Sequence, residues 1–85
     1  MVNPDGNGQS KVRDLGLAAA LVSSGHTIVA TEHDDSGRVY FIFQENRQIV
    51  KATADYWADT LLVKARTYND SIKMLKSRIY AGRGA

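Results

Sequence analysis

The stretch HTIVATEHDDSGRVYFIFQ, residues 26–44, decides the fold of this chain. It contains two runs rich in β-branched and aromatic residues, 27–32 and 39–43, with turn residues between them. Such runs predict two strands, and Gly37 suits a left-handed position in a bulged loop. We therefore predict a β-hairpin. A lone hairpin is marginal in water, so we expect helices to cover it.

The second strand alternates between two apolar faces. Successive strand residues point to opposite sides of a sheet, so Val39, Phe41 and Phe43 share one face, and Tyr40 and Ile42 share the other. We expect the face with the two phenylalanines to pack on the helices.

A helix is predicted on each side of the hairpin. Before it, Ser10 is a plausible N-cap for a helix over residues 11–24, which Gly25 would end in a left-handed conformation. After it, Asn46 can cap a second helix over residues 47–58. The run DTLLVKA, residues 59–65, is either a brief third strand or an extended connector.

The chain closes with a third predicted helix. Thr67 and Asp70 match a capping box, and Gly82 follows the expected last residue, Ala81. At 100° per residue, one narrow arc of this helix is apolar and predicts a buried seam. The seam consists of Tyr68, Ile72, Leu75 and Ile79.

These elements predict an α+β domain in the order helix, β-hairpin, helix, helix. Its small antiparallel sheet has two strands, or three if residues 59–65 add one. The polar, Gly- and Pro-containing residues 1–10 predict a flexible tail. We expect residues 11–81 to form one compact domain, and residues 82–85 a flexible end.

Composition excludes several classes of protein. The chain has no Cys, which excludes a disulfide framework and a thiolate zinc site. No stretch approaches the about 20 apolar residues of a membrane span, and the N-terminus lacks the basic and apolar regions of a signal peptide. We therefore expect a cytoplasmic protein.

Charge is distributed unevenly along the chain. Residues 1–59 hold five Lys or Arg against eight Asp or Glu, whereas residues 60–85 hold six against the single Asp70. On the last helix, a polar stripe collects cations and an aromatic residue, a pattern that suits phosphates and bases. The predicted nucleic-acid-binding residues are Lys64, Arg66, Lys73, Lys76, Tyr80 and Arg83. The alternative interpretation is an ordinary solvated helix face.

The chain contains residue types that are used in catalysis and metal binding, but their spacing does not predict a site. Glu32 and His33 are adjacent on a strand and point to opposite faces, so EHDD (residues 32–35) predicts a polar hairpin tip rather than a metal site. No spacing orders a nucleophile, a base and an orienting group. We expect no enzyme activity, metal, cofactor or small-molecule substrate.

A neighbouring aromatic pair offers a different function. Tyr56 and Trp57 point about 100° apart on a helix, so one is expected to anchor the core while the other lies nearer the surface. If exposed, Trp57 would mark a protein interface. The alternative function is thus a protein-interaction module, a homodimer or a small regulator of a larger enzyme, with Tyr40, Ile42 and Trp57 as an exposed apolar patch.

Several segments together resemble a known family. They are VRDLGLAAALVSSGHTIV, VYFIF, ADYWAD and LKSRIY, spread over residues 12–80. The pattern is similar to that of a family of small bacterial and phage proteins known only as a domain of unknown function. The resemblance implies a compact single domain and a phage or mobile-element setting, and it implies no active site.

Overall fold

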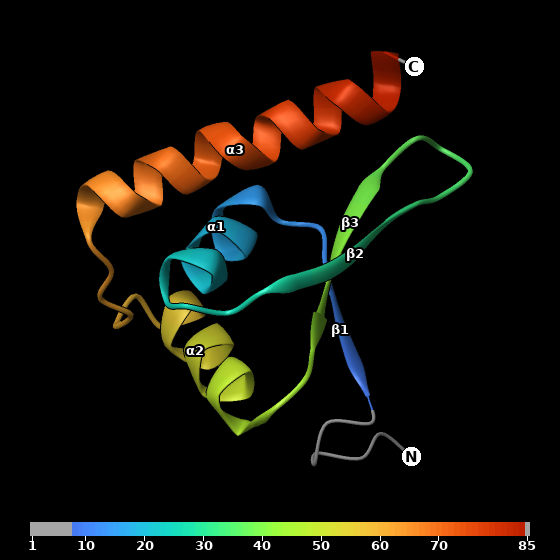
Figure 1. Cartoon of the computed structure of the whole chain (residues 1–85). Helices are drawn as coiled ribbons and strands as arrows, with labels where there is room; N and C mark the ends of the chain where they lie inside the picture. The colour runs from blue at the N-terminus through green and yellow to red at the C-terminus, as the bar shows by residue number, and fades with distance from the viewer. Residues whose placement is uncertain (1–7, 85) are drawn as a thin grey trace.

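The computed structural model describes residues 8–84, except for the side chains of residues 82–84. Over these residues the chain is α+β, with three helices and a three-stranded antiparallel sheet packed on helices. Figure 1 shows α1 between α2 and α3, with the sheet beside the helices. The elements in chain order are β1 (Gln9–Val12), α1 (Leu15–Ser23), β2 (Ile28–His33), β3 (Val39–Gln44), α2 (Arg47–Trp57) and α3 (Ala65–Gly84).

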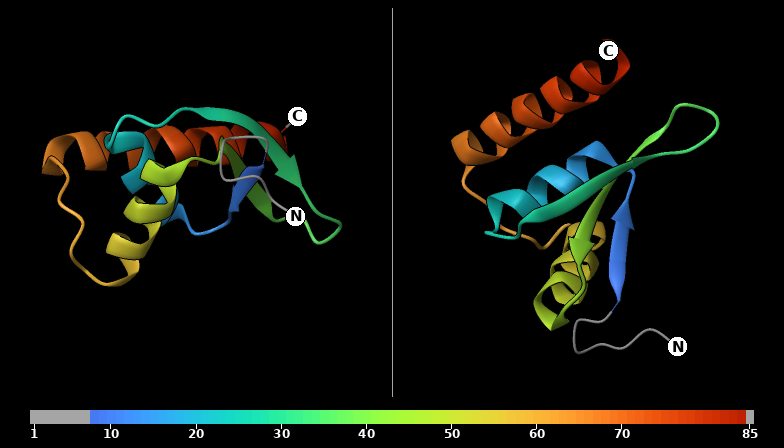
Figure 2. Two further views of the ribbon diagram at one scale, coloured as in Figure 1. Left: turned by 90° about the horizontal axis from the view of Figure 1, so that it is seen from below. Right: turned by 45° about the vertical axis from the view of Figure 1, so that its right-hand side comes forward.

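The predicted hairpin is confirmed. Strands β2 and β3 pair antiparallel, with His33 opposite Val39 next to the turn. The Asp34 carboxylate accepts hydrogen bonds from the backbone N–H groups of Ser36 at 2.9 Å and Arg38 at 3.0 Å, and Gly37 has φ of 85°. Figure 2 shows this tip projecting beyond the helices.

Strand β3 is the centre of the sheet, because the strand order is β1-β3-β2. Phe41 and Phe43 belong to the main core cluster, as their predicted face requires. Ile42 lies on the opposite face and is nevertheless fully buried. The prediction that Ile42 contributes to an exposed apolar patch is therefore wrong.

An ion pair explains part of the burial of Ile42. Lys11 lies opposite Ile42 on β1, and Glu32 lies opposite Tyr40 on β2. Their side chains meet at 3.0 Å, so the pair crosses the face of β3. Long charged side chains cover apolar surface with their alkyl stems while their charged ends stay in water.

The start of the chain differs from the prediction. Residues 9–12 form strand β1, so the predicted helix does not begin at Lys11, and Ser10 donates to Glu45 Oε1 at 2.9 Å rather than acting as an N-cap. The cap of α1 is Asp14, whose Oδ2 accepts from Leu17 N at 2.8 Å. Pairing with β1 satisfies backbone groups that β3 would otherwise leave open at that edge. The tail predicted over residues 1–10 therefore included two strand residues, and residues 1–7 lie outside the described part.

The third strand lies at the beginning of the chain, not after Trp57. Residues 60–64 are a connector without regular structure. Helix α3 then begins at Ala65, before the predicted capping box, because Tyr68 N already donates to Lys64 O at 2.9 Å. Thr67 therefore lies inside the helix, where its carbonyl accepts a hydrogen bond from Ser71 Oγ at 2.9 Å. The helix also continues past Gly82 to Gly84, so Gly82 is not its end and most of the predicted flexible end is helical.

The buried seam of α3 is confirmed. Leu75 is fully buried, and Tyr68, Ile72 and Ile79 pack against the same core cluster. The seam packs against α1, whose Ala18 and Ala19 belong to the same core cluster and are fully buried. The seam fixes how α3 is rotated, and so decides which of its side chains face solvent.

Candidate functional site

The cations of α3 gather on an exposed flank of the helix, about 110° around from the buried seam. We define the basic face as Lys64, Arg66, Lys73, Lys76 and Tyr80. The four residues within the helix fall in an arc of about 80° and extend about 21 Å along its axis. All five are exposed, and Tyr80 is 67% exposed. Arg83 belongs to the predicted site, but its side chain lies outside the described part.

The described cations of the basic face form no ion pair with a carboxylate. Among the side chains that the structure describes, the ion pairs are Lys11–Glu32 and Lys51–Asp55, and neither involves α3. Asp70, the only carboxylate in the sequence of α3, lies beside the basic face, four residues after Arg66 and three before Lys73, but forms no ion pair with either. The cations of the basic face are therefore free to meet an anionic ligand.

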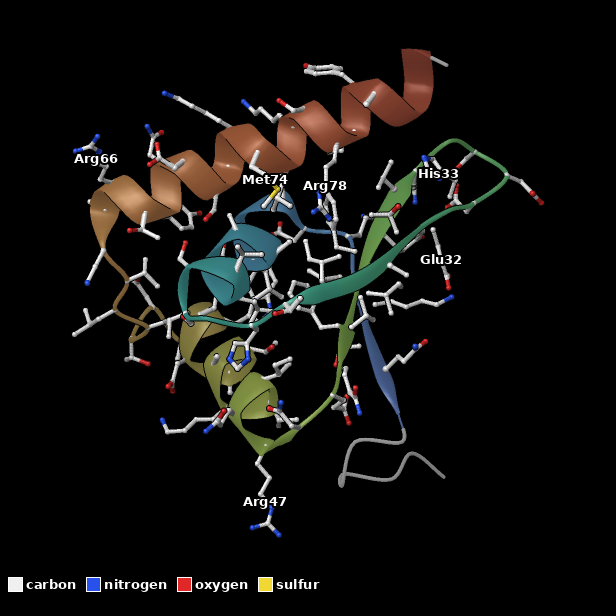
Figure 3. The ribbon with its side chains drawn as sticks, viewed as in Figure 1. Glu32, His33, Arg47, Arg66, Met74 and Arg78 are labelled. Atoms are coloured by element: carbon white, nitrogen blue, oxygen red, sulfur yellow. The ribbon has the colours of Figure 1, made fainter. Side chains whose placement is uncertain are left out.

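Arg78 is a cation of α3 that lies outside the basic face. It follows Lys76 by two residues, which places it about 160° around the helix. In Figure 3, Arg66 points away from the body of the molecule, whereas Met74 and Arg78 point from α3 toward it. The charge of this helix is thus concentrated on one side by the rotation that the seam imposes.

A pocket opens beside the first turn of α3. Its volume is about 420 Å³, and its walls come from α1, the end of α2, the connector and the start of α3. We call it the aromatic pocket, after its three aromatic residues. It is lined by Ala20, Tyr56, Trp57, Asp59, Leu61, Val63 and Tyr68.

Two tyrosines of this pocket are held by their hydroxyl groups. Tyr56 donates to Asp14 Oδ2, and Tyr68 donates to the Gly16 carbonyl, each at 3.4 Å. A Cβ at Gly16 would collide with the Tyr56 hydroxyl, so glycine gives this ring room to reach α1. Burial raises the pKa of Tyr56 above its ordinary value of 10.0, and the negative charge of Asp14 adds to the effect.

Trp57 is the most exposed of the three aromatic residues of the pocket. Its ring meets that of Tyr56 edge to face, with 5.0 Å between centroids and 83° between planes. Tyr56 packs against the core cluster, whereas Trp57 is 64% exposed. The prediction that one member of the pair anchors the core while the other lies nearer the surface is confirmed.

The predicted protein-interaction residues do not form one surface. Trp57 is exposed, but Ile42 is buried. Tyr40 is half-buried, and its hydroxyl donates to Asp34 Oδ2 at 3.2 Å. Of the three residues, only Trp57 is available to a partner in the way the alternative requires.

Of the pocket residues only Trp57 was among the predicted site residues, and among those that sequence reasoning missed, Asp59 has an unusual backbone. Helix α2 ends in a Schellman motif, in which Asp59 N donates to Tyr56 O at 3.1 Å and Thr60 N donates to Asp55 O at 2.8 Å. Asp59 occupies the left-handed position of this motif, with φ of 63°. Glycine normally fills that position. The absence of glycine at the end of this predicted helix was therefore the sequence signal that could have drawn attention to Asp59.

The described residues contain neither a cluster of potential metal ligands nor a membrane-spanning helix. No three His, Cys, Asp or Glu side chains within residues 8–84 come together in a way that could hold a metal ion. Likewise, none of the helices described here is both long enough and apolar enough to cross a bilayer.

Comparison with known proteins identifies a family and no individual relative. The family described as Domain of unknown function (DUF5659) matches residues 7–81, which is most of the chain. No curated protein and no solved structure matches the chain. The resemblance seen in the sequence is thereby confirmed: the chain belongs to the family described as Domain of unknown function (DUF5659).

Proposed function

We propose that the chain is a small non-enzymatic module that binds nucleic acid through the basic face of α3. The observation that supports the proposal is a set of exposed cations on one side of the helix with no carboxylate partner among the described side chains. Lys and Arg neutralise phosphates and release their counterions. Tyr80, at 67% exposure, adds a ring that can contact a sugar or a base.

The number of contacts sets the expected affinity. With four described cations, a monomer should bind non-specifically with Kd no tighter than about 10⁻⁴ to 10⁻⁶ M at physiological salt. Contacts to phosphate position a protein but carry no sequence information. We therefore expect little preference for sequence from the basic face itself.

The test is charge reversal with a matched control. Lys73→Glu with Lys76→Glu changes the formal net charge from +2 to −2 and leaves the buried seam untouched. Arg38→Glu with Arg47→Glu makes the same change of charge at exposed sites on the hairpin and at the start of α2. Figure 3 shows Arg47 far from α3.

Binding of a labelled oligonucleotide at low salt, followed by fluorescence anisotropy, distinguishes the two variants. The first variant should lose most of the binding and the control should keep most of it, because phosphates contact α3. Equal loss in both variants would mean that only net charge matters. Absence of binding by the unaltered protein would remove nucleic acid as the ligand.

A protein partner is the second candidate function. It is favoured by Trp57, and by Leu62 of the connector, which is 92% exposed. Large aromatic residues are enriched at the energetic centres of interfaces. Self-association that Trp57→Ala abolishes in sedimentation, while the charge-reversal variant keeps it, would favour this candidate over nucleic acid.

A further inference from the structure

The aromatic pocket lies where the basic face begins. Val63 lines the pocket, and Lys64 follows it directly in the chain. Arg66 lies at the same end of α3, as Figure 3 shows. A strand bound at the Lys64 end of the basic face therefore lies next to the pocket, whereas the cations farther along α3 point to a different side of the helix from the pocket residue Tyr68.

The pocket offers a flat apolar surface that is already in place. The indole of Trp57 is largely exposed, and the neighbouring tyrosine rings are held by their hydroxyl groups. Its volume of about 420 Å³ lies within the range of small-molecule sites. Every nucleobase has a π-face that stacks on such a ring.

We infer that the aromatic pocket takes an unpaired nucleobase with an exocyclic amino group, and hence that the basic face binds single strands in preference to duplex. This inference rests on the proposed function. In a duplex each base is stacked and paired inside the helix, so its face cannot reach Trp57 without base flipping. In a single strand the face is available.

Asp59 is the reason why we expect the bound base to carry an exocyclic amino group. Of the residues that the structure describes, it is the only charged one lining the pocket. A carboxylate repels phosphate but accepts hydrogen bonds from base amino groups such as cytosine N4. Thymine presents a carbonyl oxygen at the corresponding position. The base rather than the backbone therefore enters the pocket, and cytosine is favoured over thymine.

The chain carries its own reporter for this contact. Trp57 is the only tryptophan, so fluorescence excited at wavelengths that tyrosine does not absorb reports on the pocket. Labelled oligo(dC), oligo(dT) and a duplex of equal length are compared at low salt by anisotropy, and unlabelled strands are used to follow tryptophan fluorescence. We expect oligo(dC) to quench Trp57 and to bind several-fold more tightly than oligo(dT), while the duplex leaves the fluorescence unchanged.

Two variants complete the test. Trp57→Ala removes an exposed side chain and should weaken oligo(dC) binding about ten-fold or more while duplex affinity stays the same. Asp59→Asn should reduce the difference between oligo(dC) and oligo(dT). Circular dichroism checks that both variants are folded.

The outcomes separate the inference from the function on which it rests. Strands that bind with unchanged tryptophan fluorescence, or equally well to Trp57→Ala, would overturn the inference and leave the proposed function standing. Equal affinity for oligo(dC) and oligo(dT) would also overturn it. If no strand and no duplex binds, the proposed function itself has failed.

Discussion

Replacement of Asp59 by glycine should stabilise the protein. Helix α1 supplies the comparison, because it also ends in a Schellman motif: Gly25 N donates to Val22 O and His26 N donates to Leu21 O, each at 3.0 Å. There the left-handed position is filled by Gly25, with φ of 100°. The same position at the end of α2 carries Asp59, with φ of 63°.

Three effects determine the size of the change. An L-residue in the left-handed region costs roughly 1–2 kcal/mol, and Asp tolerates it better than most. A carboxylate at a helix C-terminus opposes the helix dipole by about 0.3–1 kcal/mol. Glycine in turn stabilises the unfolded chain by roughly 0.5–1 kcal/mol. We expect Asp59→Gly to raise the free energy of unfolding by about 0.5–1.5 kcal/mol.

Thermal unfolding followed by far-ultraviolet circular dichroism measures this change. In a domain of this size each kcal/mol moves Tm by roughly 4–8 °C, so a rise of about 2–12 °C is expected. Asp59→Asn removes the charge and keeps a residue that tolerates positive φ, so it should give a smaller rise. A lower Tm for Asp59→Gly would refute the reasoning, since it would mean that the carboxylate stabilises the fold.

Two further predictions concern the core and the hairpin tip. Leu75 is fully buried, so Leu75→Ala should lower the free energy of unfolding by about 2–5 kcal/mol, measured by urea denaturation. A loss below about 1 kcal/mol would mean that α3 is rotated differently. The Ser36 hydroxyl, followed by the Arg38 backbone N–H, lowers the pKa of Asp34 from its ordinary value of 3.8 to about 2. Because this pKa is depressed by folding, the stabilising contribution of Asp34 is fully present above pH 3.8 and is lost as pH falls through about 2; an NMR titration midpoint near the ordinary value would contradict this.

The elements set by local chemistry were predicted well. Asn46 caps α2 by accepting from Ile49 N at 2.8 Å, and Gly25 and Gly37 both have the positive φ that was expected. The seam of α3 follows from helical periodicity alone. Each of these features depends on residues a few positions apart, so the sequence pattern contains the information.

Strand β1 could not be predicted in the same way. Ser10 and Asp14 are both good N-cap residues, and local propensity does not choose between them. The choice is made by pairing with β3, about thirty residues away in the sequence, which turns residues 9–12 into a strand. The same pairing brings Lys11 of β1 to Glu32 of β2 over the face of β3, and so helps to bury Ile42.

The candidate site was predicted in part for a similar reason. The basic face follows from spacing on one helix, whereas the aromatic pocket joins residues from four segments. Tyr56 reaches Asp14, and Tyr68 reaches Gly16, over sequence separations of 42 and 52 residues. The left-handed Asp59 is also set by the way α2 ends, which residue type alone did not reveal.

The salt dependence of single-strand affinity tests directly whether the basic face binds phosphates. If the four described cations each neutralise one phosphate, the plot of log affinity against log salt should have a slope of about −3, since each contact contributes roughly −0.7 on a single strand. Lys73→Glu with Lys76→Glu should bring the slope to about −1.4 or less in magnitude, while Arg38→Glu with Arg47→Glu should leave it near −3. An affinity that does not fall with salt, or a slope that the changes on α3 leave unaltered, would contradict phosphate binding by this helix.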